Sequence, residues 1–166
     1  MLGYNKNAAD SALARFRRLD VSTICNALDQ IYDAHRVLAK AGWIAVDFYL
    51  GSIIYDFAKH QAHLMDLDMY HAGSFTNQMG RMFGSRSLMA PEEFQKGALI
   101  DEATNVFVMG RAAFLLLGDG TSERDAFGGT DAVFDVVTRA CRVDRDHRFV
   151  SMEAFCSAWK MARAGA

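Results

Sequence analysis

The stretch ATNVFVMGRAAFLLL, residues 103–117, carries apolar side chains on nearly every face of a helix. A helix that is apolar all round is buried inside a domain rather than laid on its surface. Its longest apolar run, residues 106–117, is interrupted by Arg111 and is too short to span a bilayer. We therefore expect residues 103–117 to form the central helix of a compact domain, with the rest of the chain packed around it.

Helical patterns also flank this central segment. Apolar residues such as Ile24, Leu28 and Ile31 recur on one face of a helix, and Gly42 follows as a residue suited to end it. The two C-terminal patterns are amphipathic, as in helices that cover a core. Four further ranges are thus expected to be helical: 8–19, 22–41, 131–141 and 152–162.

Short apolar runs separated by turn sequences lie between the helices. The runs are residues 44–49, 53–57 and 63–67. This spacing predicts short strands joined by tight turns. Residues 69–88 are polar, aperiodic and glycine-bearing, which predicts a long loop, and long loops in compact domains are usually functional. The predicted fold class is therefore mainly α, of the α+β kind, with a few short strands.

The composition favours one domain and gives no sign of a polyanionic partner. The chain has 166 residues and is 51% hydrophobic, which suits a single domain, residues 1–166, with a substantial core. Its 18 Lys and Arg against 20 Asp and Glu give a net charge of -2. This balance provides no electrostatic attraction to nucleic acid or to an anionic membrane. We expect neither as a partner.

The cysteines and the N-terminal residues indicate a cytoplasmic location. Cys25, Cys141 and Cys156 are odd in number, widely spaced and placed in apolar, helix-like stretches. Such cysteines are typical of reduced thiols in a core rather than of a disulfide framework. The first ten residues, MLGYNKNAAD, lack the apolar core of a signal peptide.

Acidic residues and one serine gather at the ends of the expected strands: Asp47, Ser52, Asp66 and Asp68. Oxygen ligands that converge beside tight turns are how proteins bind a hard cation. The alternative interpretation is that each carboxylate caps a turn, because Asp is frequent in turns. From these residues alone both interpretations stay open.

Three motifs follow one another along the second half of the chain. GSRSLMAPE, residues 84–92, resembles the end of a protein-kinase activation segment, where Gly-Thr or Gly-Ser leads into Ala-Pro-Glu. TNVFVMG, residues 104–110, is similar to the kinase segment Ser-Asp-Val-Trp-Ser-Leu-Gly that opens the central buried helix. VDRDHR, residues 143–148, is similar to the late Asp-Pro-x-x-Arg turn. The chain thus resembles the C-terminal lobe of bacterial serine/threonine protein kinase-like proteins.

The resemblance implies structural roles for residues near these motifs. It places Ser85, Ala90, Pro91 and Glu92 in the activation segment. It also implies that Glu92 pairs with Arg148 inside the lobe, as a structural ion pair.

The resemblance further implies a catalytic constellation with Mg²⁺ and ATP as cofactors. AVD, residues 45–47, falls where kinases have His-Arg-Asp, and MDLD, residues 65–68, falls where they have Asp-Phe-Gly. Asp47 would then be catalytic and accept the proton of the substrate hydroxyl, while Asp66 would bind Mg²⁺ at the ATP phosphates. Ser52 would assist a second metal ion and the nucleotide. Asp68 is a further candidate metal ligand whose role stays open.

The chain also departs from the kinase pattern. Ala45 and Val46 stand in place of His-Arg, Tyr49 in place of a Lys that supports the phosphate, and Asp68 in place of Gly. No Gly-rich phosphate loop or Val-Ala-Ile-Lys strand precedes the resemblance, so we expect a C-terminal lobe whose N-terminal lobe is absent.

Two functional hypotheses follow from the resemblance. In the first, the chain is the catalytic lobe of an atypical serine/threonine kinase, and it transfers phosphate from Mg-ATP to a hydroxyl only when an N-terminal lobe complements it. In the second, it is an inactive, pseudokinase-like interaction module. Its expected partners are an N-terminal lobe, another protein, or a second copy of itself. A third, more distant hypothesis is a metal-binding helical protein whose motifs match by chance.

Overall fold

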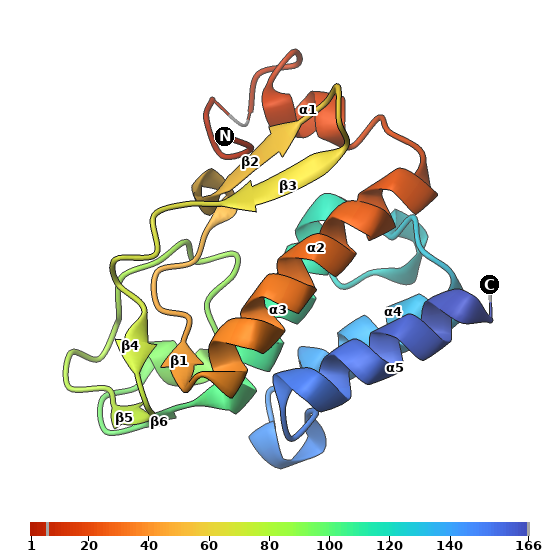
Figure 1. Cartoon of the computed structure of the whole chain (residues 1–166). Coiled ribbons are helices and arrows are strands. Elements are labelled where there is room, and N and C mark those ends of the chain that lie inside the picture. Colours follow the sequence, from red (N-terminus) through yellow and green to blue (C-terminus); the bar gives the residue numbers. More distant parts are fainter. Residues whose placement is uncertain (6, 166) are drawn as a thin grey trace.

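Figure 1 shows a body of helices with small strands along one side. The computed structural model describes residues 1–5 and 7–165. Within them lie five α-helices and three two-stranded antiparallel sheets, so the predicted mixture of helices and short strands is confirmed. The helices are α1 (Ala12–Phe16), α2 (Val21–Lys40), α3 (Glu102–Leu116), α4 (Asp131–Ala140) and α5 (Met152–Ala164).

Helix α3 lies at the centre of the fold. Asp101 caps its N-terminus by accepting a hydrogen bond of 3.0 Å from the backbone N of Ala103. Helices α2, α4 and α5 all pack against α3, and its side chains are buried along most of its length. A Cβ on Gly110 would lie 2.6 Å from Sγ of Cys141, so this glycine allows α3 and α4 to approach closely. The prediction of a central buried helix is confirmed.

Helix α2 runs across the front of α3 in Figure 1. The carboxylate of Asp20 caps its start by accepting a hydrogen bond of 2.9 Å from the backbone N of Thr23. Gly42 follows its end with a φ of 84°, a left-handed conformation that glycine adopts without steric cost. The helix expected at residues 22–41 is confirmed, and so are those expected at 131–141 and 152–162.

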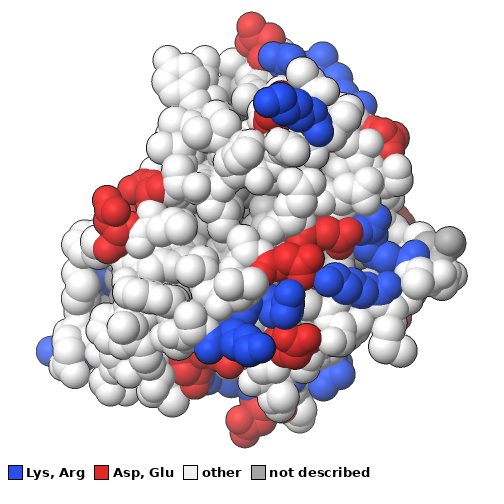
Figure 2. Space-filling view, viewed as in Figure 1, with Lys and Arg blue, Asp and Glu red and all other residues white. Residues whose placement is uncertain are grey.

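Charged side chains interleave over the surface that α2 and α5 share, as Figure 2 shows. Lys160 pairs with Asp33, and Arg163 pairs with Asp29. Exposed ion pairs contribute little stability individually. The contact between α2 and α5 therefore depends mainly on the apolar side chains beneath, among them Trp159, which is fully buried.

The helix expected at residues 8–19 is wrong in its extent, because only α1 is helical there. The Ser11 side chain caps α1 by accepting a hydrogen bond of 3.2 Å from the backbone N of Ala14. The chain then leaves the helix at Arg17, and Asp20 caps α2. The helix therefore spans only the five residues between the Ser11 cap and the turn at Arg17.

The strand expected at residues 44–49 is also wrong, because β1 covers only Trp43–Ile44, paired with β4 (His71–Ala72). The chain leaves the ladder after Ile44 because a side chain of α3, that of Asn105, bonds the next backbone N–H. Asp47 then takes a left-handed backbone with a φ of 59°, which is incompatible with a strand.

The other two expected strands form a hairpin, in which β2 (Ile53–Asp56) pairs antiparallel with β3 (Gln61–Leu64). Asp56 stabilises its turn by accepting a hydrogen bond of 2.9 Å from the backbone N of Ala58. Strand β3 ends earlier than residues 63–67 predict, because Asp66 has a φ of 60°. This left-handed residue turns the chain away from the sheet.

The loop expected at residues 69–88 is ordered by two short ladders. It contains β4 and β5 (Phe75–Thr76), and β5 pairs with β6 (Leu99–Ile100). The buried side chain of Asn77 accepts hydrogen bonds of 3.0 and 3.1 Å from the backbone N of Met79 and Gly80. The segment from β5 to β6 is therefore a closed loop with both ends held in one sheet.

Among the described residues, the buried side chains form one large cluster and one small one. The large cluster extends from Leu2 to Trp159 and contains most of α3. The small cluster lies beneath the loop between β5 and β6 and consists of Ile44, Val46, Met82, Met89 and Ile100. The small cluster thus packs this loop against the residues that lead to Asp47.

The three cysteines are free thiols, as expected. Across residues 1–5 and 7–165, none of the helices combines the length and apolar character needed to cross a membrane.

Candidate functional site

The backbone that leads to Asp47 is held by a buried amide of α3. The Oδ1 atom of Asn105 accepts a hydrogen bond of 2.7 Å from the backbone N of Ala45. Its Nδ2 atom donates one of 3.2 Å to the carbonyl of Trp43. An amide can donate and accept at once, whereas a carboxylate here would only accept. Asn105 therefore fixes the chain just before Asp47 from both sides.

Asp47 is half-buried beneath the loop between β5 and β6. Gly84, Met89 and Glu93 of that loop pack around it and leave no space that a water molecule could enter. Asp47 has a positive φ, a conformation that Asp tolerates better than most residues but that still carries strain. Strained backbone of this kind persists where the surrounding structure imposes it, commonly at functional sites.

Asp66 reaches the same region from the end of β3. The chain is fixed just before it, because the backbone N of Met65 donates a hydrogen bond of 2.9 Å to the carbonyl of Ser52. The Asp66 side chain is exposed, and its Oδ2 atom accepts a hydrogen bond of 2.7 Å from the hydroxyl of Tyr49. Asp66 and Asp47 thus both have a left-handed backbone, and each follows shortly after a short strand.

The negative charge of Asp66 acts on Asp47. The pKa of Asp47 is raised above its ordinary value, first because burial disfavours the carboxylate and second because the negative charge of Asp66 lies nearby. A cation bound beside Asp66 would relieve this repulsion. Asp47 and Asp66 therefore lie near each other, on two different turns.

Ser52 does not present its hydroxyl at this site. Its side chain is 0% exposed. Its Oγ atom accepts a hydrogen bond of 3.4 Å from the backbone N of Tyr49, within the 3₁₀ turn Leu50–Ser52. The expected role of Ser52 as a ligand of metal or nucleotide is corrected on this ground, because a ligand cannot reach a fully buried oxygen. Its role in this structure is to close the turn.

A preassembled metal cage is also not found. In the described part of the chain, no three His, Cys, Asp or Glu side chains converge in a group that could hold a metal ion. Asp68 is exposed, so the expected ligand set of Asp66, Ser52 and Asp68 is not assembled. Mg²⁺, however, is usually bound by one or two carboxylates together with substrate phosphates and water. The exposed carboxylate of Asp66, with Asp47 near it, fits that mode of binding.

Glu92 and Arg148 form a buried, two-point ion pair. The Nη1 and Nη2 atoms of Arg148 donate hydrogen bonds of 2.7 and 3.0 Å to the two carboxylate oxygens of Glu92. Thr104 donates a third, of 3.0 Å, to the same carboxylate. The Arg148 side chain also donates to the carbonyls of Ala103 and Arg142. This is the pair that the resemblance implies.

Glu93, which packs beside Asp47, is a residue that the sequence prediction missed. Its side chain is buried, and its Oε2 atom accepts a hydrogen bond of 2.6 Å from the backbone N of Ala90. Burial raises the pKa of Glu93 to about 7. The sequence signal for this role is a Glu placed as the third residue of the 3₁₀ turn Pro91–Phe94, the spacing of a capping box.

The remaining residues expected in the activation segment serve the shape of the loop. The hydroxyl oxygens of Ser85 and Ser87 lie 3.1 Å apart. Ala90 is fully buried and Pro91 begins the 3₁₀ turn. Arg111 of α3, whose partner the sequence did not reveal, donates a hydrogen bond of 2.9 Å to the carbonyl of Ser87. The loop is thus anchored on the central helix.

Comparison of the chain with models of protein families gives no match, and a search of curated proteins gives none either. What bears on function is therefore the arrangement of Asp47, Asp66 and the pair of Glu92 with Arg148.

Proposed function

We propose that this chain is the C-terminal lobe of an atypical serine/threonine protein kinase, which transfers a phosphoryl group from Mg-ATP to a hydroxyl acceptor when a second lobe complements it. The observation that carries the proposal is that Asp47 and Asp66 lie near each other on two left-handed turns, and that Tyr49, two residues after Asp47, donates a hydrogen bond to Asp66. In phosphoryl transfer the protein contributes little covalent chemistry. It acts mainly by positioning the reactants and by stabilising charge. Two fixed carboxylates, one half-buried and one exposed, suit positioning and charge stabilisation.

Asp47 suits the side of the acceptor. It is half-buried under the loop between β5 and β6, and Asn105 holds the backbone just before it. Its pKa is raised by burial and by Asp66, which brings the carboxylate closer to the basicity that a general base needs. Asp47 would accept a hydrogen bond from the acceptor hydroxyl and then its proton.

Asp66 suits the side of the metal ion. Its carboxylate is exposed at the end of β3 and would hold the Mg²⁺ that accompanies ATP. When bound, that ion neutralises charge on the transferred phosphate. The neighbouring Asp68 is also exposed, so it is available to a water molecule of the metal shell.

The buried pair of Glu92 and Arg148 supports the proposal from the structural side. It joins the end of the loop between β5 and β6 to the turn that precedes α5. These are the two places where the resemblance to kinases implies such a pair. The pair would hold the loop over Asp47 while an acceptor binds.

The nucleotide side of the site is exposed, and a partner would cover it during phosphoryl transfer. Asp66 and Asp68 lie in an exposed stretch, and the side chains of Met65 and Met69 on either side of it are 37% and 46% exposed. Apolar side chains beside a charged site are typical of a surface that a partner covers. The partner would be an N-terminal lobe with a phosphate-binding loop, supplied by another segment or another chain.

A second function is favoured by the turn at Ser52. Because the Ser52 hydroxyl is buried and Tyr49 contacts Asp66, the site lacks the second amide or hydroxyl ligand that the kinase pattern implies. A lobe of this kind would act as a pseudokinase-like interaction module. It would keep the fold and bind a protein partner without transferring phosphate.

Titration calorimetry with Mg-ATP distinguishes the two functions. We expect saturable binding to the unmodified chain and its loss in Asp66→Asn, because the amide lacks the charge that attracts Mg²⁺. The matched control is Asp135→Asn, which removes an exposed carboxylate from α4 and should leave binding unchanged. Heat that does not saturate at millimolar nucleotide would contradict the catalytic proposal and leave the interaction module.

A further inference from the structure

Tyr49 contacts Asp66 directly, yet the proposed function gives it no task. Its hydroxyl donates a hydrogen bond of 2.7 Å to Asp66 Oδ2, a length typical of a strong bond to a carboxylate. The two residues come from different segments, the turn after Asp47 and the end of β3. Their contact therefore joins the two halves of the candidate site.

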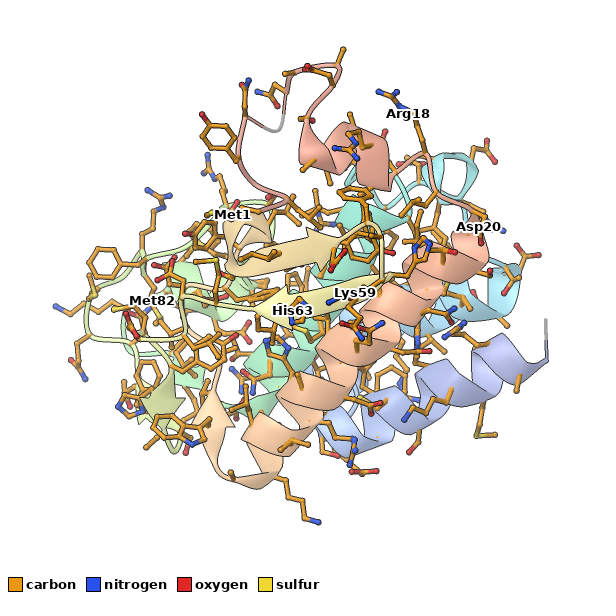
Figure 3. The ribbon with its side chains drawn as sticks, turned by 45° about the horizontal axis from the view of Figure 1, so that its top comes forward. Met1, Arg18, Asp20, Lys59, His63 and Met82 are labelled. Carbon is orange, nitrogen blue, oxygen red and sulfur yellow. The ribbon has the colours of Figure 1, made fainter. Side chains whose placement is uncertain are left out.

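The ring of Tyr49 is held in place by the absence of a side chain at Gly51. A Cβ on Gly51 would lie 2.2 Å from Cε2 of Tyr49, so any larger residue would displace the ring. The other side of this turn is covered by the N-terminal residues, since the backbone N of Gly3 donates a hydrogen bond of 3.0 Å to the carbonyl of Leu50. Figure 3 labels Met1 beside this turn, at the start of β2.

The backbone of Tyr49 is fixed as firmly as its ring. Ser52 accepts a hydrogen bond from the Tyr49 N–H through its hydroxyl and donates one of 2.9 Å from its own N–H to the Tyr49 carbonyl. The Ser52 carbonyl in turn accepts the hydrogen bond from Met65, the residue before Asp66. One buried serine thus sets the positions of both partners in the Tyr49–Asp66 contact.

We propose that Tyr49 is a positioning residue for Asp66, whose hydroxyl orients the carboxylate so that its remaining lone pairs face a Mg²⁺–phosphate ligand. The inference rests on the proposed function and deepens it. It gives Tyr49, which stands in place of a Lys of the kinase pattern, a task at the same metal site. Ligating carboxylates are commonly oriented by such outer hydrogen bonds, whose removal weakens metal binding. A neutral hydroxyl does this without bringing a positive charge toward the cation.

The test uses Mn²⁺ as the probe for Mg²⁺, with ADP present, and measures free Mn²⁺ by electron paramagnetic resonance. Tyr49→Phe keeps the ring on Gly51 and removes only the hydroxyl. We expect it to weaken Mn²⁺ binding about tenfold, the lower end of the effect of losing an outer hydrogen bond. Tyr4→Phe is the matched control, because it also removes one tyrosine hydroxyl and the Tyr4 side chain is 78% exposed.

A second variant and a spectroscopic readout separate positioning from a merely structural role. Gly51→Ala displaces the ring while leaving the hydroxyl chemically intact, and should weaken Mn²⁺ binding in the same direction. In nuclear magnetic resonance spectra of chains with ¹³C-labelled tyrosine, the Tyr49 ring signals should shift when Mg²⁺ and ADP are added. They should not shift in Asp66→Asn. A tyrosine that only supports the fold would show neither effect.

The outcomes distinguish failure of the inference from failure of the proposed function. Binding of Mn²⁺ that Asp66→Asn removes but Tyr49→Phe leaves unchanged, or strengthens, overturns the role of Tyr49 alone. The strengthening would mean that the hydroxyl competes with the metal for Asp66. A chain that binds no Mn²⁺ with ADP overturns the metal site and the role of Tyr49 together.

Discussion

Replacing Arg148 by methionine should lower the free energy of unfolding by about 3 to 5 kcal/mol, the usual cost of leaving one member of a buried ion pair without its partner. The guanidinium is 0% exposed and satisfies both oxygens of Glu92, which is itself buried. In Arg148→Met the carboxylate keeps its hydrogen bond from Thr104 and its longer ion pair of 3.4 Å with Nη1 of Arg145, but it loses both hydrogen bonds of the buried guanidinium. Urea denaturation monitored by circular dichroism measures the loss.

Two further variants show whether the loss belongs to the pair. Arg142→Met removes an exposed arginine of the same turn and should change stability by no more than about 0.5 kcal/mol. Removing both charges, in Glu92→Met with Arg148→Met, should cost less than the sum of the two single changes, because no unpaired charge stays buried. A loss below about 1 kcal/mol in Arg148→Met would contradict the description of the pair.

The same pair predicts how stability depends on pH. Burial acts to raise the pKa of Glu92, but hydrogen bonds from Arg148 and Thr104 outweigh it and hold the pKa below its ordinary value of 4.5. A carboxylate with a depressed folded-state pKa stabilises the fold above its unfolded-state pKa and loses that contribution as the pH falls through the folded-state value. The difference in stability between the unmodified chain and Arg148→Met should therefore shrink below about pH 4.5.

Replacing Trp159 by alanine should cost about 3 to 5 kcal/mol for a different reason, the cavity that a large aromatic side chain leaves in a core. Trp159 is 0% exposed and packs edge-on against Tyr32, with ring centroids 5.1 Å apart. Its indole N–H also donates a hydrogen bond of 2.6 Å to Asp29. The change would loosen the contact between α2 and α5, far from the candidate site.

The matched control for Trp159 is on the same helix. Met161→Ala removes a side chain that is 77% exposed, and should change stability by no more than about 0.5 kcal/mol. Thermal or urea unfolding of both variants makes the comparison. Equal effects of Trp159→Ala and Met161→Ala would mean that α5 does not pack on α2 as described.

The parts of the fold that the sequence predicted well are those set by local pattern. The central helix α3 follows from a segment that is apolar on nearly every face, and α2 follows from apolar residues on one face and from Gly42, whose backbone is left-handed. The hairpin of β2 and β3 follows from two apolar runs around a turn. Each of these signals lies within the segment that it specifies, so no tertiary contact was needed to recognise it.

The errors in the prediction arise where a distant side chain decides the backbone. The strand expected at residues 44–49 stops because Asn105, far away in sequence, takes a backbone hydrogen bond that the ladder would have used. The spacing of Ser52 from Asp47 suggests a ligand, but the 3₁₀ turn that contains Ser52 buries its hydroxyl. The burial of Glu93 depends on how the loop between β5 and β6 folds back, so the sequence does not indicate it. These hydrogen bonds and burials depend on the folded structure, and the spacing of residues along the chain does not reveal them.

The most direct test of the central claim is to map where Mn²⁺-ATP binds by paramagnetic broadening of backbone amide signals in nuclear magnetic resonance spectra. The account predicts that the signals of residues 47–49 and 65–68 broaden first, and that those of α4 and α5 stay sharp until much higher concentrations. Broadening that is centred elsewhere, such as the groove lined by Arg139, Arg142 and His147, would contradict it. So would spectra in which no amide responds to Mn²⁺-ATP.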